Sequence, residues 1–352
     1  MEHAAWMQRC LQLAANGAGL VAPNPLVGAV LVQGERILAE GWHRAHGGPH
    51  AEVECLRAFG DGEIPADAVM YVSLEPCSHT GLTPPCADLL IARDIRTVVV
   101  GCSDPDPRVA GKGIAKLRDA GISVLTDVLR EECRWQNRRF ITSVEEQRPY
   151  IILKWARSSD GFLDQHPRAG RTVQRISCFS SDVLVHRWRS EEQAIMVGSR
   201  TVLNDDPRLD VRHVAGRSPL RVILDRNGLA PATSHVFDGS IPTLLFTKAL
   251  RSDVDIEQVI LKSDEDPLPA VLAALNRRKV RSILVEGGAE LLGHFLRNNL
   301  WDEAREVVGE ALFLKGTPAP RMGVHPQRSI TSGSDRIHLY SRLPQPDSAW
   351  SL

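Results

Sequence analysis

The feature that most constrains how this chain can fold is a set of metal-ligand side chains within residues 50–86. A His-x-Glu motif places His50 and Glu52 at the start of an expected helix. A Pro-Cys-x8-Cys motif places Cys77 after an expected strand and Cys86 at a second helix start. One imidazole and two thiolates are ligands that zinc prefers. If all three bind one ion, two helix starts and a strand end must meet in space.

The number of ligands decides whether such a zinc ion is structural or catalytic. Four protein ligands close a structural site, whereas three leave a position for water. His79 is a fourth candidate nearby, so the count alone leaves both open. Glu52 favours catalysis, because zinc lowers the pKa of its water to about 7 and a neighbouring carboxylate can take and return a proton. Residues two apart on a helix point to nearly opposite sides, so His50 must lie in the first turn, which Pro49 supports.

Helical and strand periodicities alternate along the first half of the chain and predict helices over a mixed sheet. The expected helices are 4–17, 49–60, 86–94, 111–121 and a single amphipathic helix over 129–143. The expected strands are 27–32, 36–43, 68–74, 97–102 and 122–126.

A charged, proline-ended stretch, Val144 to Pro149, separates the two halves, and we place the domain boundary at residue 147, giving domains 1–147 and 148–352. The alternation then restarts. The expected strands are 150–156, 194–198, 221–225, 243–247 and 282–288, and the clearest helices are 180–190 and 289–299. A polar loop is expected after the strand at 194–198, and no element is predicted after residue 315, where the chain is rich in Pro and Gly.

Composition excludes several classes of protein. The formal net charge is −1, which argues against a nucleic-acid binder that works through a broad basic face. No apolar run reaches the roughly 18 residues that a membrane helix needs. The N-terminal residues do not read as a secretory signal. The seven scattered cysteines are therefore expected to be reduced thiols, and we expect a cytoplasmic protein.

In the second half, residues 283–295 read as a strand, a Gly-Gly turn and a helix. Glycines let the backbone approach a ligand, and the free N–H groups at a helix start favour a phosphate. Tight turns also need glycine, so this pattern alone is a weak signal and is not a Rossmann fingerprint.

The zinc motifs resemble those of the zinc-dependent cytidine and nucleobase deaminases. The eight-residue spacer, PNPLVGAVLV at 23–32, GGPHAE, EPCSH and DPDPRVAGKG resemble the deaminase half of the bifunctional riboflavin-biosynthesis deaminase–reductases. This resemblance implies that His50, Cys77 and Cys86 bind Zn²⁺, that Glu52 moves the proton, and that Asn24 contacts substrate. The chain departs from the family at Leu82, where a basic residue is usual.

The second half resembles the reductase half of the same family, which has a dihydrofolate-reductase-like fold and uses NADPH. The motifs are T-V-L-x-D-D-P-x-L-x-V-R (201–212) and V-E-G-G (285–288). The resemblance implies a cofactor set of Thr201, Asp205, Gly288, Ala289, Glu290, Leu291, Leu292, Gly293 and His294. It implies a substrate set of Arg189, Leu209, Arg212 and Glu286. Arg157 and Arg175 depart from the enterobacterial pattern and leave the reductase activity open.

We therefore expect a cytidine-deaminase-like three-layer α/β/α domain followed by a dihydrofolate-reductase-like α/β domain. The resemblance implies zinc-dependent deamination of 2,5-diamino-6-(5-phosphoribosylamino)pyrimidin-4-one, then NADPH-dependent reduction of its ribosyl side chain to ribityl. The alternatives are a tRNA or nucleobase deaminase with a non-catalytic C-terminal domain, and a structural zinc interaction module. The expected partner is the phosphorylated aminopyrimidine riboside, without nucleic acid or membrane, and we expect a homo-oligomer, either a dimer or a tetramer.

Overall fold

A computed structural model describes residues 3–79, 84–107, 109–168, 170–171, 173–262 and 265–346. The chain divides into two compact units, one extending to Gln147 and the other running from Arg148 to Pro344. Within the described residues, no helix is both long and apolar enough to span a bilayer.

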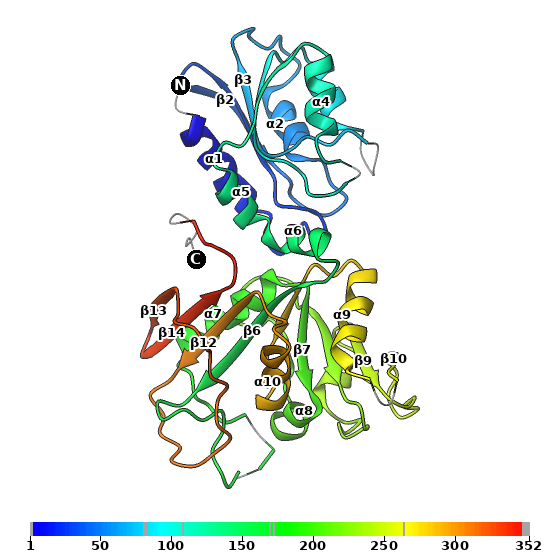
Figure 1. Cartoon of the computed structure of the whole chain (residues 1–352), viewed down its shortest axis with the longest axis vertical. Coiled ribbons are helices and arrows are strands. Elements are labelled where there is room, and N and C mark those ends of the chain that lie inside the picture. The colour runs from blue at the N-terminus through cyan, green and yellow to red at the C-terminus, as the bar shows by residue number, and fades with distance from the viewer. Residues whose placement is uncertain are drawn as a thin grey trace. The chain divides into compact units, whose positions relative to one another are not determined.

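The first unit is a mixed sheet between two layers of helices (Figure 1). Its strands are β1 Gly28–Gln33, β2 Arg36–Trp42, β3 Val69–Leu74, β4 Thr97–Cys102 and β5 Ser123–Leu125, in the order β2-β1-β3-β4-β5. Its helices are α1 His3–Ala15, α2 Ala51–Phe59, α3 Cys86–Ala92, α4 Lys112–Asp119, α5 Arg130–Gln136 and α6 Arg138–Glu145. The pair β1–β3 is antiparallel and the pairs β3–β4 and β4–β5 are parallel.

Alternating side chains of these strands fill two hydrophobic cores. Ala29 and Leu31 of β1 pack with residues of α2, α3 and α4 on one face. Val30 and Val32 pack with α1 and with Cys133 of α5 on the other. This period-two burial on both faces explains why the strands are nearly continuous apolar runs in the sequence. The three-layer α/β/α architecture expected for the first half is confirmed.

The prediction of one helix over 129–143 is wrong, because the helix breaks into α5 and α6 at Asn137. Asn137 is buried, and its side chain binds both backbone groups of Leu26: Oδ1 accepts from the N–H at 2.8 Å and Nδ2 donates to the carbonyl at 2.9 Å. The amphipathic pattern continues across the break, so periodicity alone did not reveal it.

The second unit contains a larger sheet with strand order β10-β9-β8-β7-β11-β6-β12-β14-β13 (Figure 1). The strands are β6 Tyr150–Arg157, β7 Ala194–Gly198, β8 Leu220–Leu224, β9 Thr243–Thr247, β10 Glu257–Ile260, β11 Ser282–Val285, β12 Glu303–Val308, β13 Arg328–Ser332 and β14 Asp335–Ser341. The helices are α7 Phe179–Glu191, α8 Ser199–Asp205, α9 Pro267–Arg277 and α10 Ala289–Arg297, with the 3-10 turn η1 His235–Phe237.

Strands β6 to β12 of this sheet pair in parallel, and β14 adds an antiparallel edge with β13. Helices α9 and α10 bury Val271, Leu275, Leu292 and Phe295 against one face. Two sequence-based expectations change here. The polar loop after β7 contains the helix α8, and the Pro- and Gly-rich tail forms the hairpin of β13 and β14.

Candidate functional site

Strand register brings three loops of the first unit to one edge of its sheet. Gly28 at the start of β1 pairs with Trp42 at the end of β2, and β1 is antiparallel to β3. Residues just before β1, just after β2 and just after β3 therefore lie together. Helix α2 is set close against β2, because a Cβ on Gly41 would lie 2.2 Å from the backbone nitrogen of Cys55. This packing fixes the start of α2, where His50 lies.

His50, Cys77 and Cys86 converge at this edge. His50 Nδ1 lies 3.6 Å from Cys77 Sγ and 3.3 Å from Cys86 Sγ. All three ligand atoms lie within 4.8 Å of one another, and among the described residues they form the single cluster of this kind. One nitrogen and two sulfurs at this spacing fit a zinc ion. The exposed His79 does not belong to the cluster, and Leu82 lies outside the described residues.

His50 and Glu52 can face the same site because His50 lies just before the first turn of α2. His50 is the N-cap residue with extended backbone, φ −74° and ψ 167°, and α2 begins at Ala51. Its side chain therefore does not follow the helical rotation that separates residues two apart. Glu52 is 3% exposed, and burial raises the pKa of its carboxyl group to about 7.

Cys77 and Cys86 influence each other's ionisation. Their hydrogen bond lowers the pKa of the Cys77 thiol and raises that of the Cys86 thiol. The backbone N–H of Cys86 also donates to Cys77 Sγ at 3.3 Å, which favours the thiolate. A zinc ion held by this pair would keep both sulfurs as thiolates.

Asn24 contacts His43, whose ring in turn contacts His50 of the cluster. Its Nδ2 lies 3.1 Å from His43 Nε2, and His43 Nδ1 lies 2.9 Å from the carbonyl of Pro49. Because Nδ1 must donate to that carbonyl, Nε2 accepts from the amide of Asn24. Burial lowers the pKa of His43 and keeps its ring neutral, and the ring meets His50 edge-on at 5.5 Å.

A cavity of about 440 Å³ lies in the second unit, where β7, β8, β9 and β11 end. These strands run parallel, so their carboxyl ends share one edge, the usual position of ligands on such sheets. Seven residues of the predicted cofactor set line it: Thr201, Asp205, Gly288, Ala289, Glu290, Leu291 and His294.

The other two members of the cofactor set lie elsewhere. Leu292 is fully buried in the core beneath α10, and Gly293 is not among the lining residues. This follows from helix geometry, since consecutive residues of α10 face different directions and only one side of the helix meets the cavity.

Two members of the predicted substrate set, Arg189 and Glu286, form a buried ion pair. Arg189 donates from Nε and Nη2 to the two carboxylate oxygens of Glu286, both at 2.8 Å, and from Nη1 to the carbonyl of Asp210 at 3.1 Å. Lys154 lies 3.7 Å from Glu286. Burial alone would raise the pKa of Glu286, but Arg189 and then Lys154 outweigh it and lower this pKa to about 2.

Leu209 and Arg212 are placed differently from this pair. Leu209 is 2% exposed and belongs to a hydrophobic core, with a positive φ of 51°. Arg212 is about half exposed and forms an ion pair with Asp210, while its backbone N–H donates to His186 Nδ1 at 3.1 Å.

Arg157 and Arg175, the two arginines that depart from the enterobacterial pattern, each form an ion pair with an acidic residue. Arg157 binds Glu306 at 2.6 Å, and the exposed Arg175 binds Asp182 at 3.0 Å. Neither of them lines the cavity.

Sequence reasoning missed three basic residues of the cavity. Arg168 binds Asp205 at 2.6 Å and Asp164 at 3.3 Å. Lys248 directly follows β9, and Arg226 lies two residues after the end of β8. For Arg226 and Lys248 the available signal was a position just after an expected strand, where side chains of parallel sheets meet ligands.

Comparison with known proteins gives matches over both units. The RibD C-terminal domain family matches residues 149–315, and the cytidine and deoxycytidylate deaminase zinc-binding region matches residues 1–102. The chain is 38% identical to the riboflavin biosynthesis protein RibD of Aquifex aeolicus over 320 residues, covering 87% of this chain and 88% of that protein. It is 38% identical to RibD of Bacillus amyloliquefaciens, covering 90% and 86% of the two chains.

Solved structures agree with these matches. A diaminohydroxyphosphoribosylaminopyrimidine deaminase/5-amino-6-(5-phosphoribosylamino)uracil reductase from Thermotoga maritima superposes with a TM-score of 0.85 at 34% identity, covering 96% of this chain and 98% of that one. RibD of Acinetobacter baumannii gives 0.86 at 32% identity with the same coverage. The tRNA deaminase and structural zinc module alternatives are not favoured. This chain belongs to the RibD family and joins a deaminase and a reductase of riboflavin biosynthesis in one polypeptide.

Proposed function

We propose that the first unit hydrolyses the exocyclic amine of 2,5-diamino-6-(5-phosphoribosylamino)pyrimidin-4-one, with Zn²⁺ held by His50, Cys77 and Cys86. The convergence of these three ligand atoms beside the buried Glu52 is the observation that carries this proposal. Zinc bound with three protein ligands polarises a water molecule and lowers its pKa to about 7.

Glu52 is the proton carrier in this proposal. Its carboxylate would take the two protons of the attacking water in turn and deliver one to the ring nitrogen and the other to the amino group. The C–N bond then breaks, ammonia leaves and the ring keeps a carbonyl. Asn24 is proposed to bind the substrate, since its loop lies at the same sheet edge as Cys77 and its amide is oriented by His43.

The second unit is proposed to bind NADPH in the 440 Å³ cavity and to reduce the ribosyl side chain to ribityl. Gly287 and Gly288 connect β11 to α10, whose first N–H groups suit the cofactor diphosphate. NADPH supplies the hydride, and the protein supplies position and electrostatics. For the substrate phosphate we propose Arg212, which is about half exposed, rather than Arg189, two of whose donors bind Glu286.

A coupled assay tests both steps on the full chain. We expect zinc to copurify, ammonia to be released from the diaminopyrimidinone ribotide, and NADPH to be oxidised only after that release. Absence of zinc and of ammonia release would contradict the first proposal. Ammonia release without NADPH oxidation would show that the reductase unit has lost its activity. The homo-oligomeric state and the cytoplasmic location stay predictions.

A further inference from the structure

Glu75 connects the end of β3 with a motif of the first unit that the proposed mechanism does not use. The motif, DPDPRVAGKG at 104–113, follows β4 and leads into α4. Glu75 is 4% exposed and lies two residues before Cys77. We propose that Glu75 is a positioning residue of the deaminase, which holds Asp104 and the start of α4 beside the zinc site and thereby supports substrate binding. The inference rests on the proposed deaminase function and extends it to a residue outside the metal cluster.

The Glu75 side chain is bound entirely through the backbone of this motif and of α4 in the hydrogen bonds that the structure shows. Its carboxylate accepts from four N–H groups, those of Asp104 at 3.2 Å, Gly111 at 3.0 Å, Gly113 at 3.0 Å and Ile114 at 3.3 Å. The N-cap residue of α4 is Gly111, which has no side chain to cap the helix. A carboxylate from the end of β3 therefore satisfies the first N–H groups of α4, where the helix dipole also favours a negative charge.

The start of α4 also packs directly against the residue before Cys77. A Cβ on Gly113 would lie 1.9 Å from the carbonyl oxygen of Pro76, so this close approach requires glycine. The backbone N–H of Glu75 donates to the carbonyl of Cys102 at 2.9 Å and continues the pairing of β3 with β4 beyond the strands. The chain leading to Cys77 and the start of α4 are therefore held together by both the backbone and the side chain of Glu75.

Asp104 lies at the same sheet edge as the zinc cluster, because it and Cys77 follow neighbouring parallel strands. It is half-buried, and its Oδ1 accepts a hydrogen bond from the N–H of Asp106 at 2.8 Å. Burial raises the pKa of Asp104 to about 6, and the charge of His79, which follows Cys77 in the chain, acts against this increase. A displacement of Asp104 would thus change the surroundings of the zinc site without removing a metal ligand.

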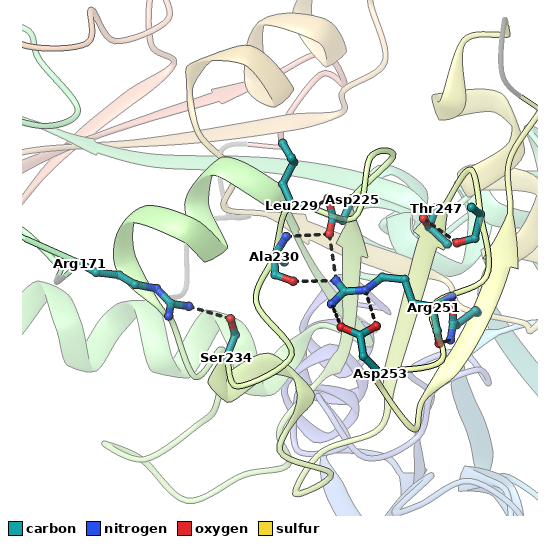
Figure 2. Close-up of polar contacts among 10 residues, drawn as sticks. Arg171, Asp225, Leu229, Ala230, Ser234, Thr247, Arg251 and Asp253 are labelled. Carbon is teal, nitrogen blue, oxygen red and sulfur yellow. Dashed lines mark hydrogen bonds and ion pairs between the residues drawn. The ribbon is translucent and has the colours of Figure 1, made fainter.

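The second unit contains a similar construction, as Figure 2 shows. Asp225 directly follows β8, is fully buried, and accepts hydrogen bonds from the N–H groups of Leu229 and Ala230, both at 2.9 Å. Arg251 also donates to the Asp225 carboxylate, at 3.3 Å. Asp225 therefore offers a matched control, a buried carboxylate that holds the loop after a parallel strand in the unit without the zinc cluster.

Steady-state kinetics of ammonia release, together with metal analysis of the full-length protein, test the role of Glu75. Glu75→Gln keeps the size of the side chain but turns an NH₂ group towards N–H donors. We expect its KM for the diaminopyrimidinone ribotide to rise about tenfold, its kcat to change less than about threefold, and its zinc content to equal that of the wild type. Glu75→Asp keeps the carboxylate on a shorter side chain and should raise KM only about threefold. Asp225→Asn should leave this KM unchanged.

Amide hydrogen exchange measures the cause of this effect. The amides of Gly113 and Ile114 should exchange at least about tenfold faster in Glu75→Gln than in the wild type. Faster exchange with an unchanged KM would show that Glu75 only stabilises α4 and would overturn the proposal. Loss of zinc in parallel with the rise in KM would also overturn it, because the effect would then come from the metal site.

If Glu75→Gln does not fold, an unchanged KM in Glu75→Asp overturns the proposal by itself. A rise in KM of equal size in Asp225→Asn would do the same, since the effect would then not depend on the position beside the zinc cluster. A wild type that binds zinc and releases no ammonia would overturn the proposed deaminase together with this role of Glu75.

Discussion

The two sites of this chain are built in different ways. The deaminase cluster uses three ligand atoms within 4.8 Å of one another, supplied by two residues at helix starts and one in the loop after β3. The reductase cavity is spread over loops from Leu163 to Thr317, and most of its lining becomes adjacent through the order of parallel strands. A metal centre thus concentrates its chemistry in a few residue types, whereas a dinucleotide site distributes it over a sheet edge. Substitutions should therefore act sharply in the first site and gradually in the second.

The largest effect should follow the loss of one metal ligand. We expect Cys77→Ala to lose zinc and to reduce ammonia release by roughly a thousandfold or more, because two ligands hold the ion poorly. NADPH oxidation with supplied deaminated substrate should be retained. Metal analysis and the two assays measure this. Cys55→Ala removes another buried thiol outside the cluster and should keep zinc; equal zinc loss in both variants would contradict the sharp contrast.

Glu286→Gln should have the next largest effect, on stability. It leaves the buried Arg189 without its carboxylate, which costs about 3–5 kcal/mol. The pKa of Glu286 is lowered to about 2, so its contribution is complete above its ordinary pKa of 4.5 and is lost as the pH falls towards 2.

Thermal unfolding of the reductase unit at several pH values measures this change. The gap between wild type and Glu286→Gln should shrink between pH 4.5 and pH 2. Glu265→Gln, at an exposed ion pair, should show no such gap. A gap that does not depend on pH would contradict the assignment of this stability to the ionised carboxylate.

The same contrast explains how far the sequence predicted the structure. Local motifs predicted His50, Glu52, Cys77 and Cys86 as a group, and strand and helix periods predicted both layered folds. The positions of Arg226 and Lys248 at the cavity depend on the pairing of β8 and β9, which no local pattern reveals. The break at Asn137 depends on a contact with Leu26, more than a hundred residues away. Leu292 was assigned to the cofactor with its neighbours, but helix rotation turns it into the core.

Asn137→Ala should have a smaller effect. It leaves the N–H and carbonyl of Leu26 without their side-chain partner, which costs about 1–3 kcal/mol. Because Leu26 follows the Asn24 loop, the KM of the deaminase should rise while zinc content stays constant. Denaturant unfolding and steady-state kinetics test this. Gln136→Ala loses one bond, to the carbonyl of Leu11, and should cost less; an equal cost would contradict the role given to Asn137.

Arg175→Ala should have the smallest effect. Arg175 is 68% exposed and its ion pair with Asp182 lies outside the cavity, so the change in stability should stay within about 0.5 kcal/mol. Titration with NADPH should give a Kd close to that of the wild type. A large loss of affinity for NADPH would contradict this prediction and would mean that Arg175 takes part in cofactor binding.

The most direct measurement compares zinc content with ammonia release in Glu52→Gln, a change that keeps the size of the side chain and removes its ability to carry a proton. Our account predicts zinc equal to that of the wild type and ammonia release reduced by at least about a hundredfold. Ammonia release at the wild-type rate with zinc bound would contradict it, because the buried carboxylate would then take no part in the reaction.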